Sequence, residues 1–257
     1  MTAGALACGC SAPAPPRAQA PAAPGGADAG YAAPPEPRAA APAAEGGVSL
    51  SGVGRPDALV RLASPDGSAI GATASNSGAW SLALPAAPEL RLYSVSEDVG
   101  GRPLRARGYL AVWSAPQAGA AMLRPGAGAE LLGAHDGLSI SALDFDLSGA
   151  AVASGSARPN QAVSLSLDGA DAGDDRADSG GRFALSLPHA LTPGPHRLTA
   201  RAGGAAAEVA FEAAPPAALP RTPYAAAREG RAWRIVWTTP GGGPQTTLLF
   251  DQAGAAR

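Results

Sequence analysis

An internal repeat limits the architecture of this 257-residue chain more strongly than its composition does. Residues 48–85 align without a gap with residues 151–188, at an offset of 103 residues. A period near 100 residues is too long for a solenoid and is typical of tandem domains. We therefore expect two copies of one domain. The aligned pairs include Gly52/Gly155, Arg55/Arg158, Pro56/Pro159, Trp80/Phe183, Leu82/Leu185 and Leu84/Leu187.

Within each copy, apolar residues alternate with polar or small residues, which is the pattern of β-strands with one buried face. The alternation covers 58–62 and 80–84 in the first copy, and 163–167 and 183–187 in the second. Turn-forming sequences such as Pro-Asp-Gly, Asn-Ser-Gly and Ser-Gly-Gly separate these runs. Short strands between frequent turns predict a β-sandwich.

Several short motifs recur in this arrangement. In one-letter code they are S-G-x-x-x-P, V-x-L, D-G and G-x-W/F-x-L-x-L-P, followed in the second copy by L-x-P-G-x-H-x-L-x-A. Together they resemble the bacterial immunoglobulin-like repeats of surface and envelope proteins. The resemblance implies that Trp80 and Phe183 fill the two cores. It also implies modules that serve mostly as spacers, stalks and binding platforms.

The fold predicted from these observations is all-β, with two tandem immunoglobulin-like β-sandwich modules, a disordered N-terminal tether and a C-terminal β-hairpin. Residues 11–47 are almost entirely Ala, Pro and Gly, and such a segment cannot bury enough apolar surface to offset its conformational entropy. The expected divisions are a truncated lipoprotein-type signal (1–10), a Pro/Ala-rich disordered linker (11–47), module 1 (48–133), module 2 (134–213), and a Pro-rich link with the C-terminal hairpin (214–257).

The first ten residues resemble the end of a bacterial lipoprotein signal. Ala5-Leu6-Ala7 places small residues before Cys8, as in a lipobox, although Ala5 stands where Leu is preferred. The basic and long apolar segments that precede a lipobox are missing, so we expect an in-frame upstream extension. The resemblance implies lipidation of Cys8, a membrane anchor, and a location in the cell envelope facing the periplasm or the exterior. The alternative is a disordered start in which Cys8 and Cys10 occur by chance.

The sequence shows no constellation expected of an enzyme. His135, His189 and His196 have neither an H-x-x-x-H nor a Cys/His spacing, so neither zinc nor another cofactor is expected. A G-x-S-x-G nucleophile elbow is missing, and the glycines at 241–243 lack the lysine of a phosphate-binding loop. His196 occupies the strand crossover, where we expect a structural role. A net charge of −2 without a basic cluster argues against nucleic acid as a partner.

One acidic cluster could in principle hold Ca²⁺, which takes several oxygen ligands. Its spacing matches no calcium loop, and strand alternation places some carboxylates on opposite faces. We therefore expect a solvated hairpin and no metal. The cluster consists of Asp168, Asp171, Asp174, Asp175 and Asp178.

Aromatic side chains gather near the C-terminus, where Trp233, Ile235 and Trp237 fall on one face of an expected strand. The turn at 240–244 then predicts a β-hairpin over 231–251. An isolated two-stranded hairpin is marginal in water, so it must dock on another surface. We expect it to dock on module 2. The alternative is a protein or glycan partner, for which these three residues would be the binding residues.

The leading functional hypothesis is a non-enzymatic cell-envelope lipoprotein whose modules act as a spacer or a protein-binding platform. The alternative is a glycan- or peptidoglycan-binding accessory protein that uses the C-terminal aromatic hairpin. The expected partners are thus the membrane, through the lipid anchor, and an envelope protein or a cell-wall glycan.

Overall fold

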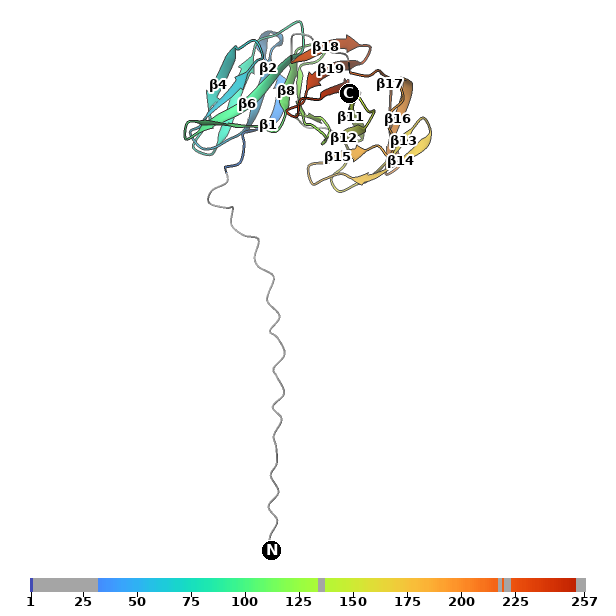
Figure 1. Ribbon diagram of the computed structural model, residues 1–257. Helices are drawn as coiled ribbons and strands as arrows, with labels where there is room; N and C mark the ends of the chain where they lie inside the picture. Colours follow the sequence, from blue (N-terminus) through green and yellow to red (C-terminus); the bar gives the residue numbers. More distant parts are fainter. Residues whose placement is uncertain (2–31, 134–136, 217–218, 220–222, 253–257) are drawn as a thin grey trace. The chain divides into compact units, whose positions relative to one another are not determined.

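The computed structural model describes residues 1, 32–133, 137–216, 219 and 223–252. By its contacts the chain divides into Met1–Ala32 and Ala33–Arg257, and all the elements named below belong to the second unit. The described residues form 20 strands and one short 3-10 helix, η1 (Ala44–Gly46), so the prediction of an all-β fold is confirmed (Figure 1). None of the described helices is long and apolar enough to cross a membrane.

The first sandwich contains two antiparallel sheets. The smaller sheet has the order β1-β2-β5, from β1 (Glu36–Pro42), β2 (Val48–Val53) and β5 (Ala79–Leu84). The larger sheet has the order β10-β9-β8-β6-β3-β4, with β7 also paired to β6. Its strands are β3 (Leu59–Ala63), β4 (Ala69–Thr73), β6 (Arg91–Val99), β7 (Arg102–Arg105), β8 (Tyr109–Trp113), β9 (Gly119–Leu123) and β10 (Glu130–Leu131).

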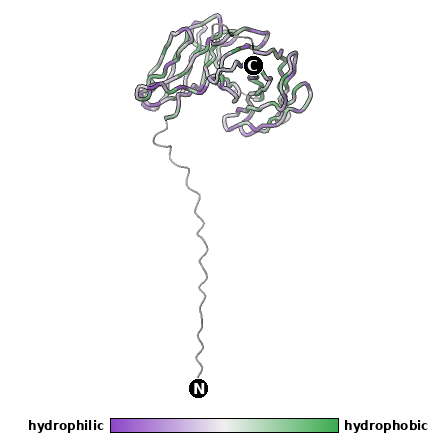
Figure 2. Tube along the Cα trace, in the orientation of Figure 1, coloured by the Kyte–Doolittle hydropathy of each residue, from purple (hydrophilic) through white to green (hydrophobic). Residues whose placement is uncertain are grey.

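The core of this sandwich lies between its two sheets. It joins Leu50 of β2 and Trp80 of β5 to Leu62 of β3, Val95 of β6 and Leu110 of β8. Along these strands hydrophilic and hydrophobic residues alternate closely (Figure 2), because one side of each strand faces the core.

The second sandwich pairs a six-stranded sheet, β15-β12-β11-β20-β19-β18, with a four-stranded sheet, β14-β13-β16-β17. Its core includes Leu143, Val163, Phe183, Leu198 and Leu248. The strands are β11 (Ser139–Asp146), β12 (Ala151–Ser156), β13 (Ala162–Leu167), β14 (Ala170–Arg176), β15 (Arg182–Ser186), β16 (Gly194–Ala202), β17 (Ala205–Ala213), β18 (Tyr224–Glu229), β19 (Ala232–Thr238) and β20 (Pro244–Phe250).

The repeat is visible in the structure as the same glycine–aromatic pair, which occurs once in each sandwich. Gly52 of β2 stands opposite Trp80 of β5, and Gly155 of β12 stands opposite Phe183 of β15. A Cβ atom on Gly52 would lie 2.5 Å from Cζ2 of Trp80, and one on Gly155 would lie 2.6 Å from Cζ of Phe183. Trp80 and Phe183 are each 3% exposed. The two glycines therefore leave the space in which an aromatic ring enters each core, as the resemblance implies.

The structure differs from the expected divisions at β1. This strand lies inside the segment 11–47, which we expected to be a disordered linker, and it pairs with β2 from Glu36 to Pro42. An edge strand tolerates proline, because a missing N–H on the open side breaks no ladder bond. The repeat thus begins earlier than expected, since β11 opens the second sandwich in the same way.

The expected C-terminal hairpin is present as β19 and β20, and the region has more pairing than was expected. It contributes three strands, β18 to β20, and β20 pairs with β11 from Ala142 to Asp146. Residues 224–250 therefore extend the six-stranded sheet of the second sandwich through main-chain hydrogen bonds, and do not merely dock on its surface.

Candidate functional site at the junction of the sandwiches

The aromatic face of β19 packs against the first sandwich, where we expected the second. Trp233, Ile235 and Trp237 are 9%, 0% and 0% exposed, and they share one apolar cluster with the outer faces of β6, β8 and β9. We call this cluster the junction core. Its buried members are Leu90, Leu92, Ala111, Ala121, Leu123, Ala129, Ala142, Trp233, Ile235, Trp237 and Leu249.

Trp237 is a fully buried member of the junction core. Its ring meets that of Tyr109 of β8 edge-on, with centroids 5.8 Å apart and an interplanar angle of 82°. This edge-to-face geometry is a favourable one for aromatic pairs. The indole Nε1–H donates a hydrogen bond of 2.9 Å to Oγ1 of Thr247. The ring is therefore packed against apolar neighbours, and its one polar atom has a hydrogen-bond partner.

A buried carboxyl group, that of Asp144 on β11, adds a polar connection beside the junction core. Asp144 is 2% exposed. It accepts hydrogen bonds from the backbone N–H of Ala129 at 2.7 Å and from Nε2 of Gln245 at 3.1 Å, and also from the hydroxyl of Thr247. Ala129 precedes β10 of the first sandwich, whereas Gln245 and Thr247 belong to β20. One side chain thus holds three segments together.

Burial is the main influence on the pKa of the Asp144 carboxyl group. Desolvation raises the pKa of Asp144 from 3.8 to about 6, although the donors Thr247, Ala129 and Gln245 each favour the carboxylate and lower the pKa. The carboxyl is enclosed by its donors, so it stabilises the junction and is not placed to act on a substrate.

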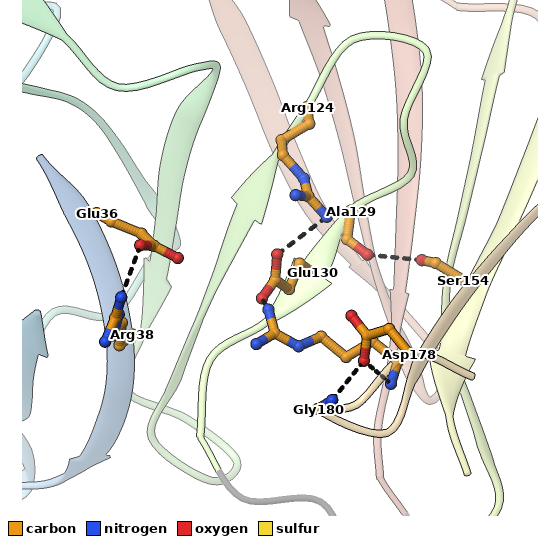
Figure 3. Close-up of polar contacts among 9 residues, drawn as sticks. Glu36, Arg38, Arg124, Ala129, Glu130, Ser154, Asp178 and Gly180 are labelled. Atoms are coloured by element: carbon orange, nitrogen blue, oxygen red, sulfur yellow. Dashed lines mark hydrogen bonds and ion pairs between the residues drawn. The ribbon is translucent and has the colours of Figure 1, made fainter. Parts of the chain in front are cut away.

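Charged and polar groups complete the junction at β10 (Figure 3). Glu130 forms ion pairs with Arg124, at 2.9 Å, and with Arg182 of β15 in the second sandwich. Oγ of Ser154 on β12 donates to the backbone carbonyl of Ala129 at 2.6 Å. A cavity of about 270 Å³, lined by these residues, lies beside them. The two sandwiches are therefore connected by apolar packing, hydrogen bonds and an ion pair.

The acidic cluster of the β14 region behaves as a set of turn and strand contacts. Asp171 accepts from the backbone N–H of Gly173, Asp175 from that of Ala184, and Asp178 from that of Gly180. Within the described part of the chain, no group of three or more His, Cys, Asp or Glu residues is placed to hold a metal ion.

His196 is held at the strand crossover as a structural residue. Its Nδ1 lies 2.6 Å from a carboxylate oxygen of Asp168, its Nε2 lies 2.7 Å from the carbonyl of Thr192, and its ring packs against Phe211. The Thr192 carbonyl, followed by the Asp168 carboxylate, raises the pKa of His196, and the hydrogen bond from His196 lowers the pKa of Asp168. Both partners can only accept, so the imidazolium form satisfies both.

Two residues singled out from the sequence, Cys8 and His135, lie outside the described residues. The sequence reasoning in turn missed Asp144 and Tyr109. The runs of β8 (YLAVW) and β9 (GAAML) offered a signal, because near-continuous apolar runs are typical of strands buried on both faces. Asp144 gave no such signal, since an acidic residue at an alternate strand position is normally solvated.

Comparison with known proteins gives only weak similarities. No protein family model matches the sequence, and a search of curated proteins found no match. Among solved structures, the chain is similar to the BSP domain of a biofilm-associated protein, with 13% identity and a TM-score of 0.23, over 69% of this chain and 29% of that one. It is also similar to a central fibronectin-III array of RIM-binding protein, with 16% identity and a TM-score of 0.24, over 82% and 74%.

A third similar structure is invasin, a bacterial integrin-binding protein, with 12% identity and a TM-score of 0.23, over 85% of this chain and 54% of that one. The chain thus spans less than a third of the biofilm protein and about half of invasin. At these TM-scores the similarities carry no weight in assigning a function.

Proposed function

We propose that the protein is a non-enzymatic lipoprotein of the cell envelope, in which two immunoglobulin-like sandwiches act as one rigid spacer or protein-binding platform. The observation that carries this proposal is the junction core. A spacer or platform has to hold its surfaces at fixed positions, and a junction closed by buried aromatic residues and a buried polar network opposes hinge motion between the sandwiches.

The junction is built more like a domain core than like a loose contact between domains. Contacts between domains of one chain are usually more polar than permanent interfaces, and relative motion is the default expectation unless the contact is large and hydrophobic. Here Ile235 and Trp237 are fully buried, and Asp144 has donors on both sides of the junction. Opening the junction would expose the indole of Trp237 to water and remove the Ala129 donor from a buried carboxyl. Both effects favour a single rigid unit.

We infer that the membrane is reached through lipidation of Cys8, with the Ala- and Pro-rich segment that follows as the tether. This part of the proposal rests on the sequence of residues 5–10. It places the sandwiches outside the cytoplasm and leaves their outer surfaces free to contact an envelope protein.

The anchor can be tested in the native host with two cysteine variants. After growth with a palmitate analogue, the parent and the Cys10→Ser variant should carry the label and sediment with membranes. The Cys8→Ser variant should lose both properties, because Ala5-Leu6-Ala7 directs lipidation to Cys8. Since Ala7 and Gly9 before Cys10 are also small, Cys8→Ser/Cys10→Ser serves as the control without any thiol. An unlabelled parent would remove the lipoprotein assignment, and a labelled Cys8→Ser variant would move the lipidation site to Cys10.

The glycan-binding alternative is disfavoured by burial. Stacking on a sugar requires an accessible ring face, whereas Trp233 and Trp237 are covered by the first sandwich. Incubation of the purified chain with isolated cell wall should therefore leave it in the supernatant. Sedimentation with the wall that disappears on replacing Trp233 by Ala would favour the alternative instead.

A further inference from the structure

An open sheet edge in the second sandwich lies beside an apolar groove. β17 ends the four-stranded sheet, and no described strand pairs with its outer side. A groove of about 910 Å³ runs along β17 and is closed on its other side by the start of β11 and the end of β20. Leu138, Ile140 and Phe250 provide apolar lining, and Val209 and Phe211 of β17 are half-buried beside them.

In the first sandwich the corresponding edge is covered by a further strand. There, β7 and β8 together occupy the position of β17, pairing with the two halves of β6 as β17 pairs with β16. β9 then covers the outer side of β8, from Tyr109 to Trp113. In the second sandwich the chain leaves β17 and joins the opposite sheet as β18. The strand that would cover this edge is thus supplied in one copy of the repeat and not in the other.

The backbone of β17 offers hydrogen bonds on its open side. The hairpin pairs Ala202 with Ala205 across the two glycines at 203–204, so the residues from Ala205 onward bond to β16 at alternate positions. The backbone groups of Ala206, Glu208, Ala210 and Glu212 consequently point away from β16. The carbonyl of Glu212 agrees with this assignment, because it accepts a hydrogen bond of 2.6 Å from Nη2 of Arg234 on β19.

Charge indicates the kind of strand that fits this edge. Among the described residues that line the groove, four are acidic and one, Arg231, is basic. Glu229, Asp251 and Glu208 have arginine partners, which are Arg234, Arg228 and Arg197. The side chain of Glu208 is still 47% exposed. The exposed carboxylates of Glu208 and Glu212 stand four residues apart on the solvent side of β17. An added strand with basic residues at matching positions would form opposite-charge pairs across the edge.

We propose that β17 binds an extended peptide segment of a partner protein by adding it as a fifth strand to the four-stranded sheet. The segment carries two basic residues four positions apart on one face, and apolar residues on the other face that enter the groove. Main-chain hydrogen bonds give the affinity and alternate side chains give the specificity, as in other cases of strand addition. This inference rests on the proposed role as a binding platform and names its partner class.

The test uses the full chain and a fluorescein-labelled heptapeptide of sequence VRVTVRV, with VEVTVEV as the matched control. Fluorescence anisotropy should show saturable binding of the basic peptide and at least tenfold weaker binding of the acidic one. The double variant Glu208→Arg/Glu212→Arg should reverse this preference. Asp171→Arg/Asp174→Arg, which changes the net charge equally on the β14 edge, should leave the preference unchanged.

A second variant tests the backbone contribution. Ala210→Pro removes an N–H from the open side of β17 without removing a bond to β16, so the chain should keep its melting temperature and lose at least tenfold in affinity for the basic peptide. Unchanged binding by a folded Ala210→Pro variant would overturn the proposal. So would the absence of saturable binding, or sedimentation of the chain alone as a dimer that Ala210→Pro dissociates, since the occupant would then be a second copy. None of these outcomes depends on the lipid anchor.

Discussion

Replacement of Trp237 by Ala should uncouple the two sandwiches. The side chain is 0% exposed and packs edge-on against Tyr109, so its removal leaves a cavity in the junction core. Loss of a buried tryptophan side chain costs about 3–5 kcal/mol. For a unit the size of Ala33–Arg257, each kcal/mol lowers the melting temperature by about 2–4 °C. The expected decrease is therefore about 6–20 °C.

Differential scanning calorimetry of the full chain measures both the shift and the cooperativity. The parent should unfold in one transition, because the junction core joins the sandwiches, and Trp237→Ala should unfold in two. Trp237→Phe keeps a ring against Tyr109 but loses the Nε1–H bond to Thr247 and part of the buried ring volume. It should therefore cost at least about 1–2 kcal/mol and less than Trp237→Ala. Leu147→Ala, at a side chain that is 62% exposed, serves as the control and should have little effect. Two separate transitions in the parent, or a Trp237→Ala variant that melts like the parent, would refute the coupling.

Three further outcomes follow from the same structure. Trp80→Ala and Phe183→Ala should each destabilise the chain by about 3–5 kcal/mol in chemical denaturation, and parental stability in both would contradict their place in the cores. Gly52→Ala and Gly155→Ala should each cost at least 1–3 kcal/mol, since the added Cβ would lie 2.2 Å or less from a backbone carbonyl oxygen; a neutral effect would contradict the close approach. Asp144 binds its proton more tightly when folded, because its pKa rises from 3.8 to about 6. Its contribution to stability is therefore present in full below pH 3.8 and falls by about 3 kcal/mol as the pH rises past 6. Relative to the parent, Asp144→Asn should thus gain most of that amount between pH 4 and pH 7, and a constant difference across this range would contradict the raised pKa.

The sequence predicted the sandwiches well because their signals are local. Alternation at period 2, glycine-containing turns and the pairs Gly52/Trp80 and Gly155/Phe183 each report on a single strand or on neighbouring strands. The strand β1 was not predicted, because its sequence, EPRAAAP, has the composition of a linker. The offset of 103 residues could have revealed it, since it maps the start of β11 at Ser139 onto Glu36. The alignment of the two copies therefore predicts this strand, whereas the composition of the segment predicts a linker.

The junction could not be predicted as readily, because it depends on which faces of distant strands meet. Trp233, Ile235 and Trp237 were identified correctly as one face of a strand, yet nothing local to them specifies whether the first or the second sandwich covers that face. Asp144 illustrates the same limit. Its strand alternation places it opposite the core of its own sandwich, and only the packing of the other sandwich against that side turns a solvated position into a buried one.

The place of β20 in the sheet has a consequence for how the chain is made. β20 lies between β11 and β19, and its residue Gln245 bonds to Asp144, which was synthesised about a hundred residues earlier. The first sandwich has all its strands once the ribosome has passed β10. β11 has no neighbour on its β20 side until translation has passed Phe250, and until then Leu143 and Phe145 lack the cover of Leu248 and Phe250. Completion of the second sandwich is therefore timed by the progress of translation, and such late, long-range strand pairing folds slowly.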